Sequence, residues 1–197
     1  MALKKVIWMG LTKIHTRLVT YLMSFKKLLQ DAAGVLLLRQ WKQIEKENIV
    51  SVEDSMLPEI LKIQAEGFKN GNPEKLVKYS KNSRNIFYVI KNGDKVVGYC
   101  IYYLKPILSF KGFEKQSVIC SIATDRNFRG RGFAEKLLEN SIEEMKLNGI
   151  SSIFLYVNVN NLPAIRLYKK TGFRVIKEVK NICGQKETCY EMEFRLF

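Results

Sequence analysis

Histidine is nearly absent from the sequence, which contains only His15, and this argues against a histidine-based metal site or catalytic triad. The four cysteines, Cys100, Cys120, Cys183 and Cys189, include no CxxC pair of the kind that binds zinc. No uncharged run reaches the roughly twenty residues of a membrane-spanning helix, and no repeats or low-complexity tracts occur. These absences leave a chain of 197 residues, with the length and hydrophobic content of one globular domain.

Acidic residues are scarce relative to basic ones. The chain carries 19 Asp and Glu against 33 Lys and Arg, which gives a formal net charge of +14. Such an excess attracts phosphate-rich or acidic partners but does not determine the fold. The ribosome, tRNA and an anionic membrane surface are the candidate partners, and ordinary solvated lysines are the alternative explanation.

The cysteines divide into two pairs by context. Cys100 and Cys120 lie in apolar stretches typical of strands, where a cysteine is usually a small buried hydrophobe. Cys183 and Cys189 flank a turn and could approach each other across a hairpin. We expect a cytoplasmic location, which disfavours a disulfide between them.

Residues 1–47 differ from the rest of the chain and are predicted to form a basic, amphipathic helical extension. Apolar residues recur at helical spacing from Leu11 to Leu29, Gly34 is expected to end the pattern, and a second short helix is expected over residues 36–44. The segment carries nine Lys and Arg against three Asp and Glu, a net +6. Three interpretations stay open: packing on the domain or on a second subunit as a homodimer, lying on an anionic membrane, and contacting RNA. A cleaved signal peptide fits poorly, because basic residues interrupt every apolar core.

From residue 48 to the C-terminus, strand and helix patterns alternate. Strands are predicted at residues 49–52, 86–91, 96–104, 115–124, 152–157, 173–180 and 188–196. Helices are predicted at residues 56–68 (with Asp54 or Ser55 as N-cap), 74–80, 133–148 and 161–170. Residues 106–112 are predicted to be a loop.

A glycine-rich turn, Arg129-Gly130-Arg131-Gly132-Phe133-Ala134, follows an apolar strand and opens the long predicted helix. Glycines let backbone N–H groups approach a phosphate, and the first turn of a helix favours negative charge. Two arginines within the turn add charge-assisted donors. The sequence therefore predicts an anion-binding turn.

A second segment, residues 161–173, follows the predicted strand at 152–157. Asn161 precedes a short helix with Pro163 in its first turn, where the missing N–H is tolerated. Gly172 stands just past the helix end, and Phe173 begins the next strand.

Together, the Arg-x-x-Gly-x-Ala turn and the Asn-x-x-Ala-x-x-Leu-Tyr-x-x-x-Gly-Phe segment resemble the two signature motifs of the GCN5-related N-acetyltransferase (GNAT) superfamily. The resemblance runs from about residue 49 to the C-terminus, and within the superfamily it is greatest to the ribosomal-protein N-terminal acetyltransferases. It implies an α/β (α+β) GNAT fold: a central, mixed, mostly antiparallel sheet flanked by helices, here over residues 48–197, with the N-terminal helical extension added.

The resemblance also implies acetyl-CoA as cosubstrate, no metal, and a set of binding residues. A bulge should splay the central strand from its neighbour and open a slot for the pantetheine arm. The implied cofactor-binding residues are Ile122, Ala123, Thr124, Arg129, Gly130, Arg131, Gly132, Phe133, Ala134, Asn161 and Tyr168.

The resemblance assigns Tyr168 as the general acid that protonates the departing thiolate. Where the ribosomal-protein acetyltransferases usually carry a glutamate before the valine of the fifth strand, this chain has Tyr156. Tyr156 is therefore a candidate for gripping the substrate or for the base. Three routes of deprotonation stay open: ordered water held by backbone carbonyls, Ser121 and Tyr156; an amine that arrives partly neutral; and a carboxylate base, Glu114 or Glu66.

The implied function is an acetyl-CoA-dependent N-acetyltransferase that works by direct attack in a ternary complex. A protein or peptide N-terminal α-amine is the first choice of acceptor, recognised by residues 68–79 and 104–114. The alternatives are a polyamine, an aminoglycoside, aminoacyl-tRNA, a non-catalytic acyl-CoA-binding module, and an RNA-associated factor. A cytoplasmic location is expected, with membrane-surface association as the alternative.

Overall fold

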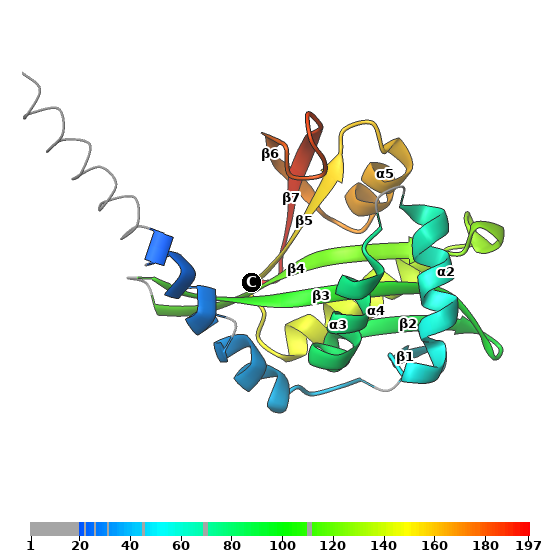
Figure 1. The fold of residues 1–197 in the computed structure, drawn as a ribbon, viewed down its shortest axis with the longest axis horizontal. Helices are drawn as coiled ribbons and strands as arrows, with labels where there is room; N and C mark the ends of the chain where they lie inside the picture. Colours follow the sequence, from blue (N-terminus) through cyan, green and yellow to red (C-terminus); the bar gives the residue numbers. More distant parts are fainter. Residues whose placement is uncertain are drawn as a thin grey trace, which may run out of the picture.

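A computed structural model describes residues 20–197 apart from 22, 26, 31, 45, 69–70 and 110–111. In this part of the chain, seven strands form one sheet in the order β1-β2-β3-β4-β5-β7-β6 (Figure 1). The strands are β1 (Ile49–Ser51), β2 (Phe87–Asn92), β3 (Lys95–Ser109), β4 (Gly112–Thr124), β5 (Ser152–Asn158), β6 (Arg174–Lys180) and β7 (Thr188–Arg195). Every neighbouring pair is antiparallel except β4 and β5, so the predicted mixed, mostly antiparallel sheet is confirmed.

Helices cover both faces of the sheet. They are α2 (Leu57–Gly67), α3 (Pro73–Asn82), α4 (Phe133–Leu147) and α5 (Leu162–Lys170), with short 3-10 turns η1 (Asp54–Met56), η2 (Arg84–Ile86) and η3 (Arg126–Phe128). One buried cluster joins α4 and α5 to the sheet, and a second joins α2 and α3 to its other face. Strand β3 serves both, since Cys100 and Tyr102 enter the first cluster while Tyr99 and Ile101 enter the second. Burial on both faces explains why this stretch of sequence is almost continuously apolar.

The predicted loop over residues 106–112 is wrong, because β3 and β4 continue through it as one long hairpin. Pro106 pairs with Lys115 inside this hairpin. Beyond Ile101, β3 pairs with β4 alone, so the missing N–H of Pro106 is tolerated on an edge. Residues 104–114 are therefore sheet rather than a variable acceptor loop, with 110–111 outside the described residues.

Two predicted helix starts are also corrected or refined. Asp54 and Ser55 form η1 instead of capping α2, whose N-cap is Met56 without a side-chain bond. The α3 helix begins at Pro73, after the N-cap Asn72, whose side chain accepts a hydrogen bond from the Lys75 N–H. Helix therefore occupies much of the predicted 68–79 loop.

The C-terminal half of the extension packs on the domain. The described residues between 20 and 39 are helical, so Gly34 does not end the helix. The expected second helix over residues 36–44 is wrong for residues 41–44, which are not helical. Gly34 is buried against β3, where a Cβ would lie 3.7 Å from the Leu104 carbonyl oxygen. The Gln30 Nε2 donates to the Pro106 carbonyl at 3.2 Å, and Trp41 packs against the core beside α4. The part of the predicted helix over residues 11–19 lies outside the described residues.

Glu144 of α4 anchors this extension. It is 4% exposed and accepts hydrogen bonds from the Trp41 indole (2.6 Å), the Ile44 N–H (2.9 Å) and the Tyr88 hydroxyl (2.8 Å). Three donors satisfy a carboxylate that would otherwise be costly to bury.

The cysteine predictions hold only in part. Cys100 is buried as expected, whereas Cys120 is exposed. Cys183 and Cys189 are joined by a disulfide, so the expectation against that bond is wrong. The bridge ties the β6–β7 connection to the start of β7, where Cys189 is fully buried.

Candidate functional site

The sheet opens between β4 and β5. These strands pair only where Gln116–Val118 meets Ser152–Phe154. Beyond that point β4 stays paired with β3 as far as Thr124, while β5 stays paired with β7 as far as Asn158. Within the described chain, the β4 edge after Val118 therefore has no partner strand on its β5 side. A free strand edge presents N–H and C=O groups to an extended ligand.

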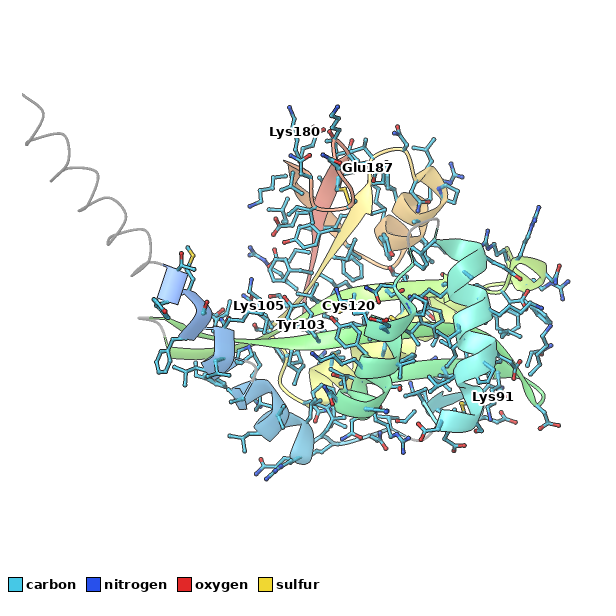
Figure 2. All side chains as sticks on the ribbon, viewed as in Figure 1. Lys91, Tyr103, Lys105, Cys120, Lys180 and Glu187 are labelled. Atoms are coloured by element: carbon cyan, nitrogen blue, oxygen red, sulfur yellow. A yellow bond between two sulfur atoms is a disulfide. The ribbon has the colours of Figure 1, made fainter. Side chains whose placement is uncertain are left out.

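A bulge in β4 marks the start of this opening. Ile101 pairs with Ser121 but Tyr102 pairs with Ile119, so Cys120 is the extra residue. The bulge and the splayed strands that the resemblance implied are both present. The exposed Cys120 thiol lies 3.5 Å from the Tyr79 hydroxyl of α3, and Ser121 is 3.0 Å from the Tyr99 hydroxyl. Figure 2 places Cys120 with Tyr103 along β3 and β4, between the N-terminal helix and α3.

The glycine-rich turn lies at the end of β4 and leads into α4. Gly130 has φ 74° and Gly132 has φ 81°, left-handed values that favour glycine. A Cβ at either position would meet nothing within 4 Å, so the turn faces open space. Gly132 is the N-cap of α4 and supplies no side-chain bond, which leaves the N–H groups of Phe133 and Ala134 without intrahelical partners. The predicted anion cradle thus has the backbone geometry it needs.

Cations surround this turn. The Arg129 Nε donates to the Thr124 carbonyl at 3.2 Å, and the Arg131 guanidinium lies 5.3 Å from the centre of the Phe128 ring. Lys95, a residue that the sequence reasoning missed, lies 4.8 Å from the same ring and 3.4 Å from the Asp125 carboxylate. The β3–β4 pairing brings Lys95 here, and only the three-dimensional register reveals it.

One buried polar atom at the site has no partner among the described residues. The Thr124 hydroxyl oxygen is inaccessible and unbonded, next to the turn and at the end of the free β4 edge. Buried hydroxyls are normally satisfied, so this one fits a ligand that brings its own hydrogen-bonding groups. Of its predicted neighbours, Ile122 packs toward α4 and α5, while Ala123 packs toward α2.

Tyr168 is held on α5 beside the core. The helix begins at Asn161, whose side chain accepts from the Ala164 N–H at 3.3 Å, so the predicted capping role of Asn161 is confirmed. The Tyr168 ring is 7% exposed and packs edge-on against Phe173 at 5.8 Å. Burial first, and the neighbouring Cys100 second, raise the pKa of the Tyr168 phenol. The phenol therefore stays protonated at neutral pH, as a proton donor must.

The helices that carry the two motifs are braced together. The Lys170 ammonium of α5 lies 2.8 Å from the Glu135 carboxylate in the first turn of α4. This contact raises the pKa of Lys170, although the side chain is exposed.

Tyr156 lies on the other side of the opening, in a row of three cross-strand neighbours. It pairs with Glu191 of β7, which pairs in turn with Lys177 of β6. The Lys177 ammonium lies 3.3 Å from the Glu191 carboxylate, which is mostly buried. Burial and then Glu191 raise the pKa of the Tyr156 phenol, against the opposing effect of Lys177. Tyr156 is thus a hydrogen-bond donor at neutral pH and is poorly suited to be the base.

Of the two other carboxylates named from the sequence, Glu114 lies away from the opening. It pairs with Ile107 in the distal hairpin, about five residues or ~17 Å before the opening begins. Glu66 is exposed near the end of α2. It precedes Gly67, which lies against Ala123 and Arg129 at the end of β4, so its role stays a prediction. Glu191 was missed because its place beside Tyr156 depends on the β5–β7–β6 order, which the local sequence pattern does not reveal.

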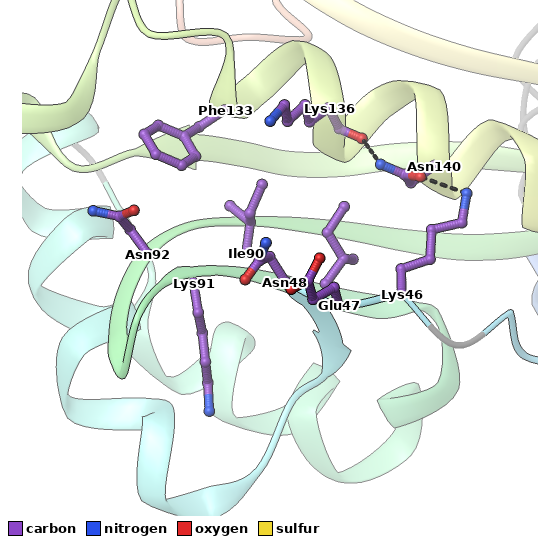
Figure 3. Close-up of a pocket in the computed structure, with 10 residues that line it drawn as sticks. Lys46, Glu47, Asn48, Ile90, Lys91, Asn92, Phe133, Lys136 and Asn140 are labelled. Atoms are coloured by element: carbon purple, nitrogen blue, oxygen red, sulfur yellow. Dashed lines mark hydrogen bonds between the residues drawn. The ribbon is translucent and has the colours of Figure 1, made fainter.

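A pocket of about 310 Å³ borders the site without belonging to the opening (Figure 3). It lies between residues 46–49, β2 and the first turns of α4. Lys46 crosses it to Asn140, and the Lys91 side chain points away from it. Within the described residues, no group of three or more His, Cys, Asp or Glu side chains is arranged to hold a metal ion.

Comparison with known proteins identifies relatives of this chain. Residues 56–173, more than half of the chain, match the model of the Acetyltransferase (GNAT) family. An N-alpha-acetyltransferase of Sulfolobus acidocaldarius is 33% identical over 121 residues, covering 59% of this chain and 72% of that protein.

Two solved structures share the fold. Naa50 of Arabidopsis thaliana in complex with the bisubstrate analogue CoA-Ac-MVNAL has a TM-score of 0.63 at 21% identity, covering 74% of this chain and 96% of that one. The ribosomal-protein-S18-alanine N-acetyltransferase of Escherichia coli has a TM-score of 0.61 at 23% identity, covering 75% and 92%. With both motifs at the opened strands and the family match across them, this chain belongs to the acetyltransferase (GNAT) family.

Proposed function

We propose that this protein transfers the acetyl group of acetyl-CoA to the α-amine at the N-terminus of a protein or peptide. The observation that carries the proposal is the divergence of β4 and β5 beside the glycine-rich turn. It gives one opening with a phosphate-binding end and an edge for an extended chain. The S. acidocaldarius relative bears the name of this activity, and the Naa50 complex holds an acetylated peptide linked to CoA.

The turn and the free strand edge supply the binding energy for acetyl-CoA. Backbone N–H groups of Gly130, Gly132, Phe133 and Ala134 would hold the pyrophosphate, with Arg129 and Arg131 adding positive charge. Main-chain groups of residues 122–124 would bond the pantetheine arm, and the Thr124 hydroxyl is free to join them.

The chemistry is a direct displacement. The neutral amine nitrogen attacks the thioester carbonyl, an N–C bond forms, and the C–S bond breaks with its electron pair going to sulfur. Tyr168 gives its phenolic proton to that sulfur, so the products are an N-acetyl peptide and free CoA thiol. The proton lost by the amine must reach a base, and the tyrosine regains its own from solvent.

Glu191 is the carboxylate that we assign to accept this amine proton, directly or through one water. It pairs with Tyr156, which borders the opening, and its mostly buried carboxylate lies 3.3 Å from the Lys177 ammonium. Tyr156 would then hold the acceptor backbone or the bridging water as a donor.

The test of the function measures CoA release from acetyl-CoA with free-α-amine peptides, lysine-only peptides, polyamines, an aminoglycoside and aminoacyl-tRNA. Mass spectrometry locates the added acetyl group. Modification at α-amines is the expected result. Turnover confined to another acceptor would overturn the assignment of substrate, and acetyl-CoA binding without any turnover would favour a non-catalytic binding module.

The test of Glu191 compares Glu191→Gln with Glu193→Gln, which lies two residues further along the same strand face and pairs with Arg195 at 3.0 Å. We expect kcat to fall about 100-fold in the first variant and to stay within about twofold in the second. The fall should shrink at high pH, where more of the amine is neutral. Equal effects in the two variants would refute the assignment.

A further inference from the structure

An apolar stripe runs along the N-terminal helix on the side away from the domain. Its large side chains, Tyr21, Phe25, Leu28, Leu29, Val35 and Leu36, are each at least 50% exposed. At about 100° per residue, all six fall within about 120° of the helix circumference, so they share one helix face. Contiguous exposed apolar surface of this kind marks an interaction site.

The opposite face of the same helix is already occupied by the protein itself. Gln30 bonds to the Pro106 carbonyl, Gly34 is buried against Leu104, and Leu37 and Leu38 pack against the core. These residues lie about half a helical turn from the stripe, since 3.6 residues complete a turn. The docked face thus fixes the helix on the domain and holds the stripe outward.

The charge of the chain selects the kind of partner. The full sequence carries +14, of which residues 1–47 contribute 9 − 3 = +6, and Lys27 and Arg39 are exposed on the stripe-bearing helix. A surface that is both apolar and anionic complements this helix, and an anionic lipid bilayer has both properties. A second copy of the chain would bring two strongly positive molecules together, which disfavours self-association through this face.

The residue types of the stripe are those of helices that lie in the membrane–water interface. Tyr21 and Phe25 are aromatic residues of the type that settles at the level of the lipid headgroups. No helix within the described residues has the length and apolarity needed to cross a bilayer. We propose that the N-terminal helix lies in the surface of an anionic membrane, with this stripe buried among the lipids.

The geometry keeps the acetylation site clear of the membrane. The helix contacts β3 at Pro106, eight residues along the strand from Gly98, which pairs with Thr124 at the glycine-rich turn. At 3.3 Å per residue, this separates the two by about 26 Å. Figure 1 accordingly shows the helix at one end of β3 and β4 and α2 at the other.

The experiment is sedimentation of the full chain with vesicles of phosphatidylcholine alone or mixed with phosphatidylglycerol. We expect binding to the mixed vesicles, weakened at high salt, and little binding to phosphatidylcholine alone. The double variant Phe25→Ser, Leu28→Ser should bind at least about tenfold more weakly, because two large apolar groups are lost from the lipid contact. Met23→Ser is the matched control, since Met23 is 69% exposed on the same helix but off the stripe.

Several outcomes would overturn the proposal. Absence of binding to the mixed vesicles would do so, and so would equal binding by the double variant, because basic charge alone would then account for the attraction. A wild-type dimer that the double variant converts to monomer, without vesicle binding, would assign the stripe to a second copy. Unchanged acetyl-CoA affinity in the double variant would confirm that it remains folded.

Discussion

The Gly132→Ala variant tests whether the glycine-rich turn binds phosphate or is an ordinary tight turn. Gly132 has φ 81° and caps α4, so an alanine there adopts a left-handed conformation at a cost of roughly 1–2 kcal/mol in the free energy of unfolding. The new methyl group meets no protein atom within 4 Å, so no steric term adds to this. In the proposed binding mode, the methyl group would enter the space of the pyrophosphate. Losing one hydrogen bond to a charged group, about 1.5–3 kcal/mol, weakens acetyl-CoA binding roughly 10- to 100-fold.

The control for this variant is Gly93→Ala in the β2–β3 turn. Gly93 has φ 61°, and a methyl group added there would likewise meet nothing within 4 Å. Both variants should lose similar stability in thermal unfolding, while only Gly132→Ala loses acetyl-CoA affinity in isothermal titration calorimetry. Affinity within about twofold of wild type in Gly132→Ala, or an equal loss in Gly93→Ala, would refute the cradle.

Three further predictions concern the site and its supports. Tyr168→Phe should lower kcat about 100-fold or more with acetyl-CoA affinity nearly unchanged, and an unchanged kcat would remove the tyrosine from the mechanism. Alkylation of the exposed Cys120 by iodoacetamide should slow when CoA is bound, with the buried Cys100 as the unreactive internal control; mass spectrometry of the labelled peptides checks both. The hydrogen bond from the Asn127 N–H, and secondly Lys95, lower the pKa of Asp125 in the folded protein. The ionised carboxylate therefore stabilises the fold fully above the unfolded pKa of about 3.9, and this contribution is lost as pH falls through the lower folded pKa. At neutral pH, the free energy of unfolding of Asp125→Ala should therefore be about 1 kcal/mol lower than that of the wild type. Chemical denaturation below about pH 4 should show a smaller difference between the two proteins.

Local sequence signals are sufficient to predict helix ends, because these depend on interactions within a few residues of the chain. Gly132, Asn161 and Gly172 mark helix ends by rules that act within a few residues, and the structure places all three at such ends. The glycine turn and the α5 helix were accordingly located to within a residue or two. The binding and catalytic roles of these residues stay predictions.

Features that depend on partners distant in sequence were not predictable in this way. Pro106 looks like a loop residue until one knows that β3 has a free edge there, and Gly34 looks like a helix end until Leu104 is seen against it. Glu191 becomes a candidate base only through the strand order that places it beside Tyr156. In each case tertiary packing decides what local propensity leaves open.

Glu144 has a consequence for where this protein can be cut. Two of its three hydrogen-bond donors, Trp41 and Ile44, come from the segment before residue 48, and only Tyr88 comes from the sheet. A fragment that starts at residue 48 would leave an interior carboxylate short of two donors, each contributing about 1.5–3 kcal/mol. The boundary between extension and enzyme is thus a boundary of sequence motifs only. In folding and unfolding, residues 41–44 belong to the same cooperative unit as α4, and a shortened enzyme should begin before Trp41.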